Sequence, residues 1–143
     1  MAYVVANQGG KAILLSDTTV NESSKDLDLE TLLGGSYEIL ALRIEFTASV
    51  EVGTRIIVLR VMSGADIIFE MDIEALEAIV ASASATVHLV PNLSVADFVR
   101  NSLEYQWMPP ILLPKGAVLR VVDRADIDDG VDDMVIHATV RAI

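Results

Sequence analysis

The chain has 143 residues, a length that suits a single domain. Acidic residues outnumber basic ones by 21 to 10, and the resulting net charge of −11 opposes binding to phosphate backbones, so we expect no nucleic-acid partner. The sequence has no cysteine, which excludes disulfides, thiol catalysis and thiolate metal sites.

Hydrophobic residues make up 52% of the chain and aromatic residues only 5%. A monomer of this size would struggle to bury so much aliphatic surface, so we expect part of it to lie in contacts between identical subunits. The apolar runs are far shorter than the roughly 20 residues of a membrane-spanning helix. The N-terminal stretch MAYVVANQGG also lacks a signal-peptide pattern. We therefore expect a soluble chain with no membrane partner.

The first 36 residues contain two short apolar pieces between segments rich in Ser, Thr, Asn and Asp. Such a segment cannot form a core alone. We expect residues 1–36 to be an extended arm that adds strands to its own domain or to a neighbour's sheet edge. Within it, SSKDLDLETLLGG (23–35) favours a helical turn that ends at Gly34. Residues 37–143 are expected to form the domain itself.

Strand patterns begin at Tyr37. In YEILALRIEFTASV (37–50), every second residue is apolar, which is typical of a half-buried strand. The apolar positions are Leu40, Leu42, Ile44, Phe46 and Ala48. TRIIVLRVM (54–62) is apolar at nearly every position and should be buried on both faces. With IIFEM (67–71) and the glycine turns between these segments, the pattern predicts a three-stranded antiparallel meander.

Two later segments carry helical patterns. DIEALEAIV (72–80) has helix-forming residues and could equally be an edge strand, but we favour a short helix. Ser94 and Asp97 resemble a capping box and predict a second short helix over 94–103. The QWMPP stretch (106–110) breaks any helix.

The last third again predicts strands, at 111–113, 117–123 and 134–143, with a Pro-Lys-Gly turn after the first of them. The whole chain then has about seven to nine short strands separated by turn signals. This predicts an all-β fold, an antiparallel β-sandwich of jelly-roll type with one or two short helices and an N-terminal arm.

The stretch ADIDDGVDDM (125–134) is the strongest candidate for chemistry, as a Ca²⁺ site. Its aspartates are Asp126, Asp128, Asp129, Asp132 and Asp133. An EF-hand loop needs oxygen ligands at positions 1, 3 and 5, Gly at 6 and Glu at 12, and no frame of this stretch supplies them. We therefore favour a solvated hairpin turn, with a looser Ca²⁺ site as the less favoured alternative.

No residue pattern indicates catalysis. The acids fall in turns or outward strand positions, His88 and His137 lie mid-strand without a nameable third metal ligand, and no serine elbow or phosphate-binding glycine loop occurs. We expect no enzyme activity, no catalytic residue and no cofactor. Tyr105 and Trp107 remain as a candidate ligand or interface pair. Exposed aromatics beside acids can stack on sugars, although we favour Trp107 as a core or interface residue.

Two turn motifs carry a resemblance to a known class of protein. The first is VGTR (52–55) opening an apolar strand, and the second is LPKG (113–116) feeding a strand and then the aspartate-rich loop. Over residues 37–143 the chain resembles small β-sandwich virion structural proteins of tailed bacteriophages. The resemblance implies a virion component built from β-sandwich subunits, and no catalytic residues come with it.

Together these observations predict a capsid decoration or cement subunit, located in the virion. We expect a homo-oligomer, with a trimer favoured, that contacts other virion proteins such as the major capsid protein. Two alternatives stay open: a neck, tail or fibre subunit, and a β-sandwich module that binds carbohydrate or a host surface through Tyr105 and Trp107.

Overall fold

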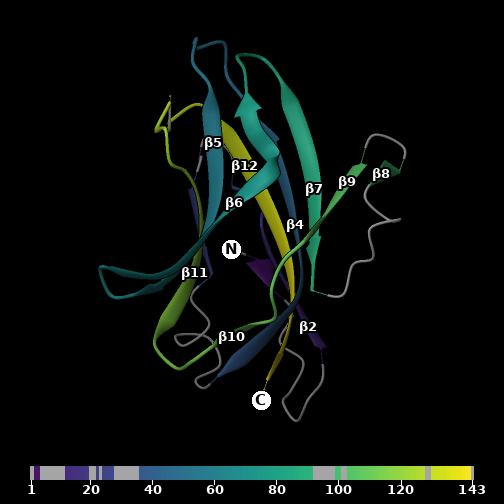
Figure 1. Cartoon of the computed structure of the whole chain (residues 1–143), viewed down its shortest axis with the longest axis vertical. Helices are drawn as coiled ribbons and strands as arrows, with labels where there is room; N and C mark the ends of the chain where they lie inside the picture. The colour runs from purple at the N-terminus through teal and green to yellow at the C-terminus, as the bar shows by residue number, and fades with distance from the viewer. Residues whose placement is uncertain are drawn as a thin grey trace.

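The computed structural model describes residues 2–3, 12–19, 22, 24–27, 36–91, 99–100, 103–127 and 130–142. Within these residues every regular element is a strand (Figure 1). The strands are β1 (Ala2–Tyr3), β2 (Ala12–Asp17), β3 (Ser24–Leu27), β4 (Tyr37–Thr47), β5 (Arg55–Ser63), β6 (Asp66–Ile79), β7 (Ser84–Val90), β8 (Val99–Arg100), β9 (Leu103–Trp107), β10 (Ile111–Leu113), β11 (Ala117–Asp123) and β12 (Asp133–Ala142). In this part of the chain there is no helix long and apolar enough to cross a membrane.

The strands form two sheets. The larger has the order β1-β2-β12-β4-β7-β9-β8, with β10 also paired to β4, and the smaller has the order β3-β11-β5-β6. The pairs are antiparallel except β7 with β9, which is parallel. The β4–β5 and β11–β12 connections both cross from one sheet to the other. An all-β fold of two sheets is therefore confirmed.

One hydrophobic core lies between the sheets. Buried side chains of both sheets belong to a single cluster, for example Leu15, Ile44 and Ile136 from the larger sheet and Leu59 and Leu119 from the smaller. Each of these strands is amphipathic because alternate side chains point to opposite faces of a sheet. The arrangement is consistent with a β-sandwich.

The predicted meander is half right. β5 and β6 pair as an antiparallel hairpin, closed by the two-residue turn Gly64–Ala65 between Ser63 and Asp66. Gly64 has a φ of 59°, which suits the first central position of a type II′ turn. β4, however, lies in the other sheet and pairs with β12, β7 and β10. Alternation identified the strands but not their neighbours.

The alternation of β4 slips by one residue. Leu42, Ile44 and Phe46 are buried as predicted, but nearer the start of the strand Ile39 is buried instead of Leu40. The cause is a β-bulge: Thr139 of β12 faces Ala41, whereas the next residue, Val140, faces Ile39. Leu40 is the extra residue that the partner strand does not match.

The predicted helix at 72–80 is wrong, because this segment is the second half of β6. Ile73, Leu76 and Ile79 are buried at a spacing of three residues, as on a helix. In β6 this spacing arises from bulges, at which β6 has extra residues that β5 does not match. Ala78, within this bulged part, has a φ of 61°. A bulged strand can therefore imitate a helical pattern of burial.

The other predicted helices fall partly outside the described residues. Residues 92–98 lie outside them, and the rest of the expected helix at 94–103 includes strand β8 and the start of β9. The helical turn expected at 23–35 is replaced by β3 over its first residues, and 28–35 lie outside the described residues. In the expected arm, β1 pairs with β2, β2 pairs with β12 and β3 pairs with β11, so the larger sheet gains two strands from it and the smaller sheet gains one.

Lys25 fixes the crossing between β2 and β3. Its side chain is fully buried, and its ammonium donates to Asp17 Oδ1 at 3.1 Å, to the Thr19 carbonyl at 2.8 Å and to Glu22 Oε2 at 2.7 Å. An ammonium has three N–H donors, so all of them are used. Burial acts to raise the pKa of Asp17, but hydrogen bonds from Thr19 and Lys25 outweigh it and bring the pKa below 3.8.

Candidate functional site

A buried ion pair holds the aspartate-rich loop to the β4–β5 turn. Asp132 Oδ2 and Oδ1 accept hydrogen bonds from Arg55 Nε and Nη2, each at 2.9 Å, and both side chains are fully buried. Asp132 Oδ1 also accepts the Ser49 N–H at 2.7 Å. Arg55 Nη1 donates to the carbonyls of Glu51 and Gly53. This Arg55–Asp132 clamp ties the β4–β5 connection to the β11–β12 connection.

The clamp keeps Asp132 ionised. Burial by itself would raise the pKa of Asp132, but the hydrogen bonds from Arg55 and Ser49, with the charge of Arg55, outweigh burial and lower the pKa below 3.8. Both oxygens of the Asp132 carboxylate therefore accept hydrogen bonds from groups of the protein itself. The interpretation of the loop as a solvated turn is wrong at Asp132.

A second buried aspartate, which the sequence reasoning missed, shapes the start of the same loop. Asp123 Oδ1 accepts the N–H groups of Ile56 at 2.9 Å and Ala125 at 3.0 Å, and its Oδ2 accepts the Ile127 N–H at 3.1 Å. Ile127 in turn packs on Gly53, where an added Cβ would lie 2.9 Å from Ile127 Cδ1. Gly53 also has a φ of 151°, so two constraints favour glycine there.

The other predicted ligands are not gathered around a common centre in the described residues. Asp126 is exposed with a φ of 54°, Asp133 is half-buried at the start of β12, and Asp128 and Asp129 lie outside the described residues. Over the described parts of the chain, no three His, Asp or Glu side chains are grouped so that they could hold a metal ion. A Ca²⁺ site here would have to compete with Arg55 and Ser49 for Asp132.

A row of polar and aromatic side chains crosses the outer face of the larger sheet. Strand pairing aligns Ser16, His137, Arg43, His88 and Tyr105, on the adjacent strands β2, β12, β4, β7 and β9. The residues between these positions on β12, β4 and β7 point into the core, so the row faces outward. At about 4.8 Å per strand, the row is roughly 19 Å long.

Side-chain contacts fix the first part of this row. Ser16 Oγ lies 2.8 Å from His137 Nδ1, and Arg43 Nη2 donates to Glu45 Oε1 at 2.7 Å. His137 Nε2 lies 3.9 Å from the other oxygen of Glu45. The side chains of Arg43, Glu45 and His137 remain 43%, 37% and 33% exposed. The row therefore offers donors and acceptors to solvent.

Tyr105 and Trp107 lie at the β9 end of the same face. They are two residues apart on one strand, so their side chains point to the same side of the sheet. The Tyr105 ring stacks on His88, with centroids 5.0 Å apart and planes at 19°. Trp107 faces Val90 of β7 and is 50% exposed. The interpretation of Trp107 as a core residue is wrong, and an interface role stays a prediction.

His88 and His137 do not approach each other. Arg43 lies between them in the row, so they are two strands, or roughly 10 Å, apart, which is too far for one metal ion. Burial and the charge of Arg43 lower the pKa of His88 below 6.5, against a weaker opposing effect of Glu45. His88 Nε2 is buried, and within the described residues it has no hydrogen-bond partner.

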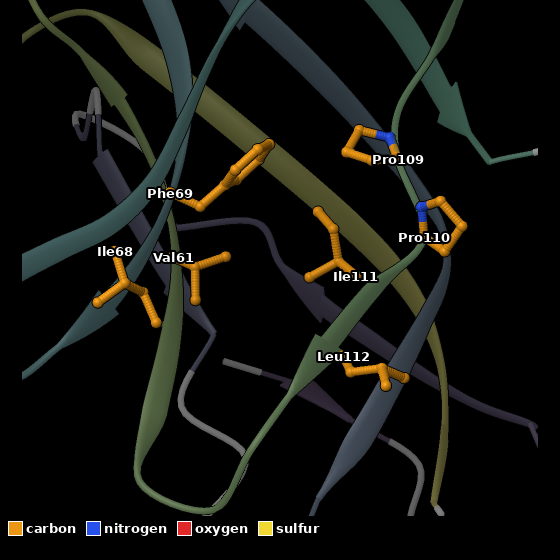
Figure 2. Close-up of a pocket in the computed structure, with 7 residues that line it drawn as sticks. All are labelled: Val61, Ile68, Phe69, Pro109, Pro110, Ile111 and Leu112. Atoms are coloured by element: carbon orange, nitrogen blue, oxygen red, sulfur yellow. The ribbon is translucent and has the colours of Figure 1, made fainter.

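A groove lined only by apolar side chains lies between the β5–β6 hairpin and the segment that leads into β10 (Figure 2). Its volume is about 250 Å³. The lining residues are Val61, Ile68, Phe69, Pro109, Pro110, Ile111 and Leu112. Ile68 is 56% exposed and Leu112 is 61% exposed, so the groove opens to solvent between apolar rims.

The β5–β6 hairpin projects from the two sheets (Figure 1). Residues 63–70 are all exposed, and β6 is the last strand of the smaller sheet. Ile67 is 48% exposed and does not line the groove, although Ile68 and Phe69 beyond it in the strand do. Sequence patterning marked this segment as a strand but could not show that neither face is covered.

Comparison with known proteins adds no family to these observations. No protein-family model matches the chain, and no curated protein matches it. The resemblance carried by the VGTR and LPKG turns therefore stays a prediction. The structure does give the first motif a physical role, because Gly53 and Arg55 are its contacts to the aspartate-rich loop.

Proposed function

We propose that the protein is a non-enzymatic structural subunit of a tailed-bacteriophage virion, a jelly-roll-like capsid decoration or cement protein that works as a homo-oligomer. The observation that carries self-assembly is the apolar groove with the exposed hairpin beside it. The VGTR and LPKG turns support the placement in a virion.

The exposed apolar side chains beside the groove support association with a partner. Ile67, Ile68, Phe69 and Leu112 are 48%, 56%, 36% and 61% exposed. Together they present on the order of 350 Å², within the range of about 300–600 Å² covered by the largest and often functional patch of a monomer. A standard interface needs about 800 Å² per partner, so this patch would be the apolar centre of a larger contact.

The chain itself supplies both halves of such a contact. Ile67 is exposed near the turn of the hairpin and lies outside the groove lining, whereas Ile68 and Phe69 line the groove. A contact in which Ile67 of one subunit enters the groove of the next joins two different surfaces. Such head-to-tail contacts close into rings when the rotation allows it, and a ring of three is the form we favour.

Light scattering on a size-exclusion column tests self-assembly. We expect a particle three times the 15.4 kDa of one chain, and a monomer for Ile67→Asp and for Ile68→Asp. Val52→Asp is the matched control, because Val52 is 86% exposed in the β4–β5 turn and lies outside the groove lining. A wild-type monomer that does not co-sediment with capsids of its phage would overturn the proposal.

The position in the virion needs a separate experiment. Reconstruction of the particle with and without the protein shows where its density lies. Density on the capsid lattice supports a decoration or cement role. Density at the neck or along the tail would replace that role with the alternative structural one.

A further inference from the structure

We infer that the outer face of the larger sheet binds a neutral carbohydrate chain, with Trp107 as the stacking platform and the Arg43–Glu45 pair as the hydrogen-bonding groups. Trp107, Arg43 and Glu45 do not line the groove, although Leu112 of its lining stands on the same face, on β10. The inference therefore does not rest on self-assembly, and a monomer could bind in the same way.

The strand register brings the necessary groups to one surface. Tyr105 and Trp107 project from the same side of β9. On the neighbouring strand β7, His88 pairs with Tyr105 on one side and with Arg43 of β4 on the other. Arg43 is thus two strands, or roughly 10 Å, from the strand that carries Trp107. A sugar ring that stacks on the indole would direct the rest of a short chain along the row toward Arg43 and Glu45.

The chemistry of the row matches that of a sugar. A pyranose ring has an apolar C–H face and a rim of hydroxyl groups, each of which donates and accepts a hydrogen bond. Trp107 offers a half-exposed aromatic face for the first. The Arg43 guanidinium donates and the Glu45 carboxylate accepts, and both are more than one third exposed.

The groups are held in place before any ligand arrives. Arg43 is fixed by the 2.7 Å bond to Glu45, His137 by Ser16, and Tyr105 by its stack on His88. Ordering a long side chain on binding costs free energy, so such pairing lowers the cost of recognition. The positive and negative charges of Arg43 and Glu45 also compensate each other, which favours a neutral ligand over a charged one.

Other ligand classes fit this face less well. A nucleic acid would meet a chain with a net charge of −11. A protein partner needs a contiguous apolar centre, but the exposed large apolar side chains of this face stand on separate strands, Leu14 on β2, Leu112 on β10 and Trp107 on β9. Leu14 and Trp107 are four strand spacings, or roughly 19 Å, apart.

The full chain provides its own probe, because Trp107 is its only tryptophan. We would screen the labelled protein on an array of neutral oligosaccharides and then titrate each retained glycan while recording tryptophan emission. We expect retention of at least one neutral glycan and a shift or quenching of the emission on binding. Arg43→Gln should weaken the binding measured by emission at least tenfold, and Trp107→Ala, which has no tryptophan to record, should lose retention on the array.

Two controls distinguish a specific loss of glycan binding from loss of folding and from loss of self-assembly. Ile68→Asp should leave glycan binding unchanged, since the groove is not involved. Each variant should keep a cooperative melting transition close to that of the wild type. Failure to retain any neutral glycan on the array would overturn the inference, and so would binding that Trp107→Ala leaves intact.

Discussion

The Arg55 guanidinium and the Asp132 carboxylate form a two-pronged ion pair, with both hydrogen bonds at 2.9 Å and neither side chain exposed. The two residues are 77 positions apart in the sequence and lie at the ends of two connections that cross between the sheets, β4–β5 and β11–β12. Bidentate pairs of this kind are among the stronger hydrogen-bonded contacts in proteins. The clamp therefore holds the turns of both sheets in a fixed relation.

Removing one partner of the clamp should destabilise the fold strongly. Asp132→Ala leaves a buried guanidinium without its counter-charge, and Arg55→Ala leaves a buried carboxylate, so each should lower the free energy of unfolding by about 3–5 kcal/mol. Denaturant unfolding measures this change. Asp126→Asn is the control from the same loop, because Asp126 is exposed and Asn tolerates its φ of 54°, so the replacement should matter little. Equal effects of Asp132→Ala and Asp126→Asn would contradict the role of the clamp.

Gly53 should not tolerate a side chain. An added Cβ would lie 2.9 Å from Ile127 Cδ1, and its φ of 151° is one that other residues rarely adopt. Backbone strain of this kind costs about 1–3 kcal/mol, so Gly53→Ala should lower stability by at least that amount. Gly130→Ala is the matched control, since nothing lies within 4 Å of the Cβ that it would add. If Gly53→Ala and Gly130→Ala melt at the same temperature, Gly53 does not pack closely on Ile127.

Chelation should leave the fold intact. Asp132 is already satisfied by Arg55 and Ser49, and Asp123 by three backbone N–H groups, so the loop is held without a cation. The melting temperature should then be the same with EDTA and with added CaCl₂. A rise with CaCl₂ that EDTA reverses would instead support the Ca²⁺ alternative.

Much of the fold could be predicted from the sequence because burial imposes a period of two on each strand. This period placed β4 and β12 close to their observed positions, whereas an almost unbroken apolar run placed β5 and the Pro-Lys-Gly turn before it placed β11. Alternation failed as a guide where bulges shift the period, at Leu40 in β4 and between Ile73 and Ile79 in β6. In β6 the shifted pattern resembles that of a helix. It also could not assign β4 and β5 to different sheets, because alternation does not identify the partner strand.

The candidate sites were less predictable than the strands. Tyr105 and Trp107 could be named from their residue types, but Arg43, Glu45 and His137 join them only through the order of strands in the larger sheet. The Arg55–Asp132 clamp joins distant segments in the same way. A buried arginine inside the apolar run of β5 was the one available signal, because a charge at an inward position needs a partner.

The clamp also predicts how stability depends on acid. The pKa values of Asp132 and Asp17 are lowered in the folded protein, below an ordinary value of 3.8. Between the folded and ordinary values the unfolded chain binds more protons, so stability falls as the pH falls through this window. The contribution of both groups should thus be complete above about pH 4 and lost progressively below it.

Unfolding curves measured from pH 6 to pH 2 test this expectation. Asp17 and its partner Lys25 are the same in both proteins that are compared. In Asp132→Asn, which cannot titrate at this position, the loss below pH 4 should be smaller than in the wild type. Parallel losses in the two proteins would show that Asp132 is not a source of the acid sensitivity.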